Sequence, residues 1–188
     1  MTFARLVLAA ATNDPVPEPR TTKLPPRQAA QAIVQYYLNN IHVLLPAFSS
    51  THIISLLDDI YSQDPRQHPV SSDYWLLYMV LAIGSTTQSR SNQDEYYNNG
   101  VEFVARALPY ADRALMPGYV TQIQSLLLLT QYSMLDPAHF DSWHLIGFTC
   151  RAVIDLGYNQ DPPLPQNSDK SALDARRRTF YCVYALDR

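Results

Sequence analysis

The chain has 188 residues, of which 47% are hydrophobic and 16% are charged, and its net charge is −3. This length suffices for one domain with a sizeable core, and the charged share lies below the usual ~25%. The acidic balance argues against a nucleic-acid-binding surface within this segment, because such surfaces are normally basic. It does not exclude a DNA-binding module elsewhere in the same gene product.

The chain contains two cysteines, Cys150 and Cys182. Two cysteines cannot build a disulfide framework or a cysteine-rich zinc site. Both lie among apolar residues of expected helices. We therefore expect two buried thiols in a reducing compartment.

The N-terminal region is expected to be separate from the main domain. The apolar run from Leu6 to Ala11 follows Arg5 and loosely resembles a secretory signal peptide. Its six residues fall short of the ~7–15 that such a signal needs. A short surface helix, or a fragment of an upstream element, is therefore preferred over secretion. Residues 13–26 carry five prolines among charged residues, which predicts a linker. Residues 1–26 then form an N-terminal segment with a proline-rich linker, and residues 27–188 form the domain.

Helical spacing of apolar residues continues through most of residues 27–188, and no alternating stretch is long enough to predict a strand convincingly. The expected helices cover approximately residues 27–42, 51–61, 73–87, 91–108, 119–136, 138–156 and from 171 onward. The longest apolar run, residues 74–83, is too short for a bilayer, which needs ~20 residues, and predicts a helix buried on all sides. We expect no membrane contact. The fold class is all-α, a bundle or array of about seven helices with short loops.

Local signals mark several helix ends. Ser91 with Asp94, and Ser171 with Asp174, have the spacing of capping boxes. Gly157 lies where a left-handed residue is expected to end a helix. In the helix over 138–156, the inward face is predicted to consist of Phe140, Trp143, Gly147, Cys150 and Ile154.

The acidic pair Asp58 and Asp59 is a weak candidate for a metal site. It resembles the aspartate-rich magnesium site of helical isoprenoid synthases, but Ser62 occupies the position of the third carboxylate. Two solvent-facing aspartates are the preferred interpretation. A synthase stays a remote alternative, to be tested by magnesium-dependent turnover of a prenyl diphosphate.

A second candidate is the cluster of His139, Asp141 and His144. Two histidines that bind one metal from a helix normally stand four residues apart, and these stand five apart. A helix start is preferred, with Asp141 in the first turn and His144 beside Trp143. No phosphate-binding loop or nucleophile elbow is present. The chain is expected not to be an enzyme, with no catalytic, cofactor-binding or metal-binding residues.

Arg176, Arg177 and Arg178 form the basic cluster of the sequence. Adjacent helical residues point in directions ~100° apart, so the three cannot form one phosphate-binding patch. We expect a structural clamp, in which one arginine pairs with an acidic residue and the others lie in solvent or at an interface. The nearest acidic candidates in sequence are Asp155, Asp174 and Asp187.

The chain resembles the fungus-specific transcription factor domain, the middle regulatory region of fungal zinc-cluster (Zn2Cys6) transcription factors. The likeness covers about residues 30–188 and is most specific in the last 45. It begins with Tyr36, Tyr37, His42 and Pro46 and continues with the leucine-rich stretch 126–132, and then with Gly147, Ala152 and Leu156 around Trp143. The signature positions, to which the resemblance assigns structural roles, are Trp143, Arg151, Gly157, Asp174, Arg176, Arg177, Arg178, Asp187 and Arg188.

Three positions depart from the family pattern. Tyr158 and Asn159 stand where the family often has a histidine, Tyr181 replaces a common tryptophan, and Asp174 replaces the commoner glutamate. These changes are conservative for packing. The family domain also continues beyond the Leu-Asp-Arg stretch, so a partial domain, truncated at both ends, is expected.

The resemblance implies a nuclear regulator of DNA-templated transcription. It places DNA binding and zinc in an N-terminal six-cysteine module, which two cysteines cannot supply, so this segment should not touch DNA. Protein partners, self-association and a small-molecule effector are the contacts that it implies for the middle region. The alternative is a free-standing helical protein-interaction module without DNA-binding function.

Overall fold

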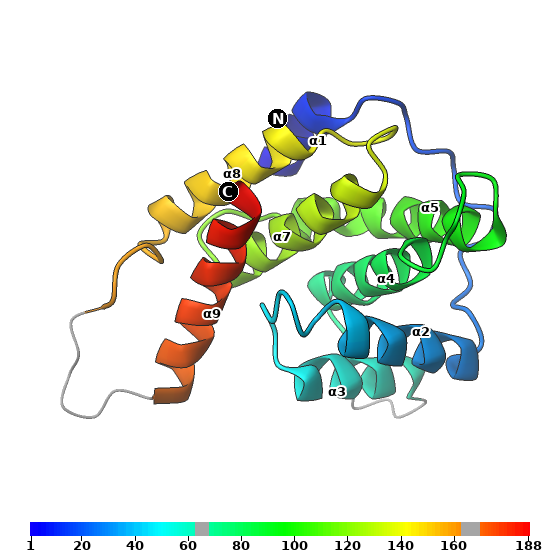
Figure 1. The fold of residues 1–188 in the computed structure, drawn as a ribbon, viewed down its shortest axis with the longest axis horizontal. Helices are drawn as coiled ribbons and strands as arrows, with labels where there is room; N and C mark the ends of the chain where they lie inside the picture. The colour runs from blue at the N-terminus through cyan, green and yellow to red at the C-terminus, as the bar shows by residue number, and fades with distance from the viewer. Residues whose placement is uncertain (63–67, 163–169) are drawn as a thin grey trace.

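The computed structural model describes residues 1–62, 68–162 and 170–188, and the regular elements in these ranges are all helical (Figure 1). The all-α prediction is confirmed. The α-helices are α1 (Phe3–Ala11), α2 (Arg27–Asn40), α3 (Ser50–Tyr61), α4 (Ser71–Thr86), α5 (Glu95–Ala107), α6 (Ala111–Ala114), α7 (Val120–Leu135), α8 (Ser142–Asp155) and α9 (Lys170–Asp187), with a 3₁₀ turn over Leu108–Tyr110.

The helix α4 is the centre of the fold. It packs against α2, α3, α5, α6 and α7, and its residues from Trp75 to Thr86 are all buried. The neighbouring α7 buries its leucine run, residues 126–129, completely. The sequence predicts this burial for the run in α4, because an apolar run without a polar face must be covered on every side, and the same reason applies to the leucine run of α7. Each such side chain contributes about 1.5–3 kcal/mol when it leaves water.

Glycines let two helices approach α4 closely. A Cβ atom on Gly100 of α5 would lie 1.9 Å from the side-chain oxygen of Thr86. One on Gly84 of α4 would lie 2.8 Å from a side-chain carbon of Ile33 in α2. The close contacts between α4 and α5 and between α2 and α4 therefore depend on glycine at positions 100 and 84.

The N-terminal segment is packed against the body. In α1, Ala4, Val7 and Ala11 are buried, and the helix contacts α8 and α6. The chain then pairs with the turn before α8, where the backbone N–H of Asn13 donates to the carbonyl of His139 at 2.9 Å. These contacts cross the expected domain boundary at residue 27, which itself stays a prediction.

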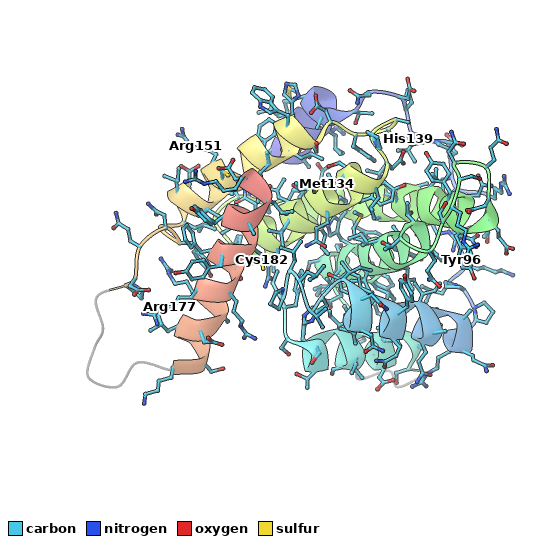
Figure 2. All side chains as sticks on the ribbon, in the orientation of Figure 1. Tyr96, Met134, His139, Arg151, Arg177 and Cys182 are labelled. Atoms are coloured by element: carbon cyan, nitrogen blue, oxygen red, sulfur yellow. The ribbon has the colours of Figure 1, made fainter. Side chains whose placement is uncertain are left out.

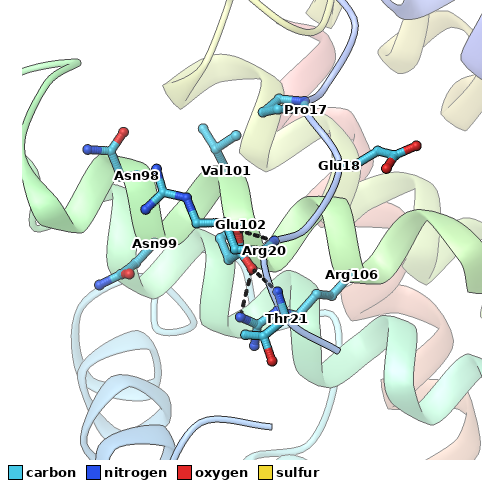
Figure 3. A pocket seen from close by; sticks show the side chains of 9 residues that line it. All are labelled: Pro17, Glu18, Arg20, Thr21, Asn98, Asn99, Val101, Glu102 and Arg106. Carbon is cyan, nitrogen blue, oxygen red and sulfur yellow. Dashed lines mark hydrogen bonds and ion pairs between the residues drawn. The ribbon is translucent and has the colours of Figure 1, made fainter. Parts of the chain in front are cut away.

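The lead-in to α2 is held on α5 (Figure 3). The carboxylate of Glu102 accepts hydrogen bonds from the backbone N–H groups of Arg20 and Thr21, at 3.2 and 3.3 Å. Arg106 donates to the carbonyl of Lys23 at 2.8 Å and pairs with Glu102 at 2.9 Å. Burial opposes ionisation of Glu102, but these hydrogen bonds outweigh burial and lower the pKa of its carboxyl.

Several helix ends differ from those expected. The helix α8 begins at Ser142 and not at residue 138, because Asp141 caps it and residues 138–141 pair with residues 11–14. Asp94 caps α5 in place of Ser91, and Ser171 already lies within α9. Part of the proline-rich loop before α9, residues 163–169, lies outside the described residues. Within the described ranges, no helix combines the length and apolar character that spanning a membrane requires.

Candidate functional site

The junction of α8 and α9 contains most of the signature residues. The last turn of α8 ends at Gly157, which has a φ of 67°. The N–H of Gly157 donates to the carbonyl of Ile154 at 2.9 Å, and that of Tyr158 donates to Val153 at 2.8 Å. This is the Schellman ending, which needs a residue in the left-handed region and so favours glycine. Gly157 thus ends the helix in the left-handed region, as its position in the sequence predicts.

Arg176 and Arg177 fasten α9 to this turn. The guanidinium of Arg176 donates to the carbonyls of Gly157 and Gln160, and it lies 4.3 Å from the centre of the Tyr158 ring. Arg177 makes a two-pronged contact with the carboxylate of Asp161, at 3.0 and 2.6 Å. The hydrogen bond and positive charge of Arg177 lower the pKa of Asp161. We call these five residues, Gly157, Tyr158, Asp161, Arg176 and Arg177, the arginine clamp.

The other predicted partners behave differently. Arg178 pairs with Asp174 one turn earlier at 3.2 Å, and both side chains are exposed. Asp155 is paired with Arg151 of its own helix at 3.0 Å, so it does not serve the cluster as expected. Asp161 was missed, because no spacing rule connects a loop residue to a helix 16 positions later.

At the C-terminal end of α9, Asp187 does not pair with the arginine cluster either. It lies beside Cys150 of α8. Burial, followed by the charge and hydrogen bonding of Asp187, raises the pKa of the Cys150 thiol to about 11. The guanidinium of Arg188 lies 5.1 Å from the centre of the Tyr184 ring. The signature residues thus make local contacts within and between α8 and α9.

Both cysteines are free thiols with raised pKa values. Cys182 is buried and lies on the side of α9 that faces the body (Figure 2). Burial raises its pKa to about 11, against a lowering effect of Arg178. Cys150 is only partly buried, unlike the prediction. Neither thiol is activated as a nucleophile, since an activated thiol has a lowered pKa.

The predicted inward face of α8 is wrong. Trp143 is 76% exposed and Ile154 is 59% exposed, whereas Leu145, Thr149 and Val153 are buried with Ala152. Only Phe140, which precedes the helix, is buried as expected. Both candidate faces have helical spacing, and α8 packs against α1, α7 and α9.

A buried carboxylate that the sequence did not reveal lies beyond α7. Asp136 is 1% exposed and accepts hydrogen bonds from the hydroxyls of Tyr97 and Tyr132, both at 2.8 Å. The ring nitrogen Nδ1 of His139 lies 2.7 Å from the same carboxylate. We call these four residues the Asp136 cluster. The cluster joins α5, α7 and the turn before α8. His139 and His144 therefore have different partners, since His144 pairs with Asp141 at 2.9 Å.

The described residues do not assemble a metal site of three or more histidine, cysteine or acidic side chains. Asp58 pairs with Arg27 on the surface, in agreement with the preferred interpretation of that aspartate. A cavity of about 290 Å³ lies between α5 and the lead-in, lined by Glu18, Arg20, Asn99 and others (Figure 3). Its walls hold charged and polar side chains.

The fungal specific transcription factor domain matches residues 34–188 of the chain. The chain belongs to this family. The match begins within α2 and includes the arginine clamp, the Asp136 cluster and the whole of α8. No solved structure matches this fungal transcription factor domain.

Curated relatives of this fungal transcription factor domain are transcriptional regulators. The pyrimidine pathway regulatory protein 1 of Saccharomyces cerevisiae is 29% identical over 61% of the chain and 12% of its own length. Protein STB5 of the same yeast is 27% identical over 86% of the chain and 23% of its own length. A Candida glabrata relative, the negative regulator of pleiotropic drug resistance STB5, is 30% identical over 60% of the chain and 12% of its own length. The chain therefore spans less than a quarter of these relatives.

Proposed function

We propose that this domain is a nuclear control module that regulates transcription through protein contacts and does not itself touch DNA. The proposal rests on one observation in this family of transcription regulators. The arginines of the basic cluster already have partners within the chain. Arg176 and Arg177 are engaged by carbonyls, a ring and Asp161, and Arg178 is paired with Asp174. With a net charge of −3, the chain offers little attraction for phosphates.

In the same proposal, DNA is bound by a separate six-cysteine zinc module of the full-length protein. The middle domain restrains or releases an activation segment, with a small molecule as the trigger. No enzymatic step is part of this function, since the clamp and the Asp136 cluster hold segments of the chain together.

The test is a reporter experiment. The chain is inserted between a heterologous DNA-binding domain and an activation domain, and transcription is compared with that of a fusion carrying a neutral helical insert. The proposal expects that transcription from the fusion with the chain differs from transcription from the fusion with the neutral insert. It also expects no shift of duplex DNA by the purified chain at low salt. Transcription equal to the neutral insert, or salt-sensitive binding of DNA by the chain, would contradict it.

The alternative function, a free-standing helical interaction module, is favoured by the exposed apolar face of α8. Measurements on the full-length protein distinguish the two functions. Bound zinc and sequence-specific DNA binding there support the transcription factor, and their absence supports the interaction module.

A further inference from the structure

The outward face of α8 is apolar although it lies at the surface. Trp143 and Ile154 are exposed, and Gly147 between them is exposed as well. Figure 2 shows Arg151 on the outer side of the helix. A hollow along this face is lined by Trp143, His144, Ile146, Gly147, Phe148, Arg151 and Asp187. Exposed patches of large apolar side chains mark interaction surfaces.

Gly147 makes no close approach to another helix within the described part of the chain. Glycine in a helix interior is unfavourable relative to alanine and is normally kept where another backbone comes close. A Cβ atom on Gly147 would meet no heavy atom within 4 Å. By contrast, Gly84 and Gly100 are both in close contact with neighbouring helices. The open side of Gly147 therefore fits a backbone that comes from outside the chain.

We propose that α8 binds a second copy of this chain, with the two α8 helices crossing antiparallel at Gly147. Trp143 and Arg151 stand four residues before and four residues after Gly147, on the ridge that most often packs between crossing helices. A twofold axis at Gly147 places each Trp143 indole against the Arg151 guanidinium of the other copy. The surface is thus self-complementary, as a twofold interface requires.

The charges of this face suit that pairing. Arg151 bonds Asp155 through Nε at 3.0 Å, and its side chain remains 76% exposed. The planar face of its guanidinium is therefore free to stack on an indole, the best aromatic partner for a cation. The rings of Trp143 and His144 meet with their planes at 89°, and Trp143 remains 76% exposed. This contact leaves most of the indole surface uncovered. The proposal does not depend on the proposed function.

The experiment is analytical ultracentrifugation of the chain 1–188 across the micromolar range. The wild type is expected to show a monomer–dimer equilibrium. Gly147→Leu is expected to raise the dissociation constant at least about tenfold, because a large side chain blocks the crossing point. Leucine favours helices over glycine and meets open space in the monomer, so this variant keeps its fold.

Two further variants test the stacking contact. Trp143→Ala and Arg151→Ala are each expected to weaken the dimer, and the double variant is expected to weaken it by less than the sum of the two effects. Leu44→Ala is the control, since Leu44 is as exposed as Trp143, at 76%, and lies on another surface. It should leave the dissociation constant unchanged.

Tryptophan emission identifies what covers the face. The other tryptophan, Trp75, is 0% exposed, so a concentration-dependent blue shift reports Trp143. A wild type that remains monomeric overturns the proposal. Emission typical of an exposed indole would then point to a different protein partner, and emission typical of a buried one to another segment of the same polypeptide. A dimer that Gly147→Leu leaves intact overturns it equally.

Discussion

Three adjacent arginines in α9 have three different environments. Arg176 is partly buried against a ring and two carbonyls, Arg177 makes an exposed two-pronged ion pair, and Arg178 makes an exposed pair within its own helix. Exposed ion pairs contribute about 0–1 kcal/mol, because water screens them and the side chains lose freedom. A guanidinium that is partly buried and stacked on a ring contributes more.

Replacement of Arg176 by alanine should therefore lower the free energy of unfolding by about 1–2 kcal/mol. Arg177→Ala and Arg178→Ala should each lower it by less than about 1 kcal/mol. Urea unfolding followed by circular dichroism measures these differences. Arg176→Lys is the control for charge, since it keeps the cation but loses the planar stack. Equal losses for all three alanine variants would show that Arg176 is not special.

The Asp136 cluster is the second feature at this scale. Its carboxylate accepts hydrogen bonds from three parts of the chain. Asp136→Ala would deprive the buried Tyr132 and the partly buried Tyr97 and His139 of this acceptor. It should lower the free energy of unfolding by about 3 kcal/mol.

The matched comparison is Tyr97→Phe, which removes one donor and leaves the carboxylate with two. It should cost about 1 kcal/mol. Thermal and urea unfolding of both variants provide the measurement. If Asp136→Ala costs no more than Tyr97→Phe, the carboxylate does not organise the cluster.

At the scale of elements, α4 and α5 approach each other closely at Gly100. Gly100 faces Thr86 with no room for a side chain, and it also lies near the carbonyl of Ala82, which would be 3.3 Å from an added Cβ. Moving α4 away from α5 would cost free energy, because other helices pack against the remaining sides of α4.

Gly100→Ala should therefore destabilise the fold by about 2 kcal/mol, even though alanine is the better helix former. Gly147→Ala is the matched control, since it is also a glycine within a helix but meets open space. Measured at low protein concentration, it should raise stability by up to about 1 kcal/mol. Opposite signs in urea unfolding support the argument, and two changes of the same sign contradict it.

At the scale of the whole molecule, tyrosine hydroxyls link α5 and α3 to distant segments. Tyr97 donates to Asp136 at 2.8 Å, and Tyr61 donates to the carbonyl of Pro25 at 2.6 Å. Burial raises the pKa of Tyr97 to about 12, helped by the hydrogen bond and charge of Asp136. Burial likewise raises the pKa of Tyr61 to about 12, helped by Tyr78 and opposed by Arg106.

These raised pKa values predict alkaline destabilisation. An unfolded tyrosine ionises near pH 10, and the folded ones near pH 12. Their contribution is therefore complete below pH 10 and is lost as the pH rises from 10 towards 12. Urea unfolding across this range should show falling stability. The variant Tyr61→Phe/Tyr97→Phe should show a shallower fall, and an unchanged slope would refute the assignment.

Parts of this fold were determined by the sequence alone. The apolar runs in α4 and α7 have no polar face, so burial on all sides is their only stable placement, and Gly157 can end α8 because glycine tolerates a positive φ. The all-α class and the family likeness of the last two helices rest on such local signals. They needed no knowledge of neighbours.

Only the tertiary structure decided which face of α8 turns inward. Leu145, Thr149 and Val153 recur at helical spacing, and so do Trp143, Gly147 and Ile154, so periodicity cannot choose between the two faces. The choice was made by the elements that pack on the helix, among them α1, which the sequence did not place. The Asp136 cluster and the Asp161 contact were hidden for the same reason, because their partners are distant in sequence and meet only after the helices have packed.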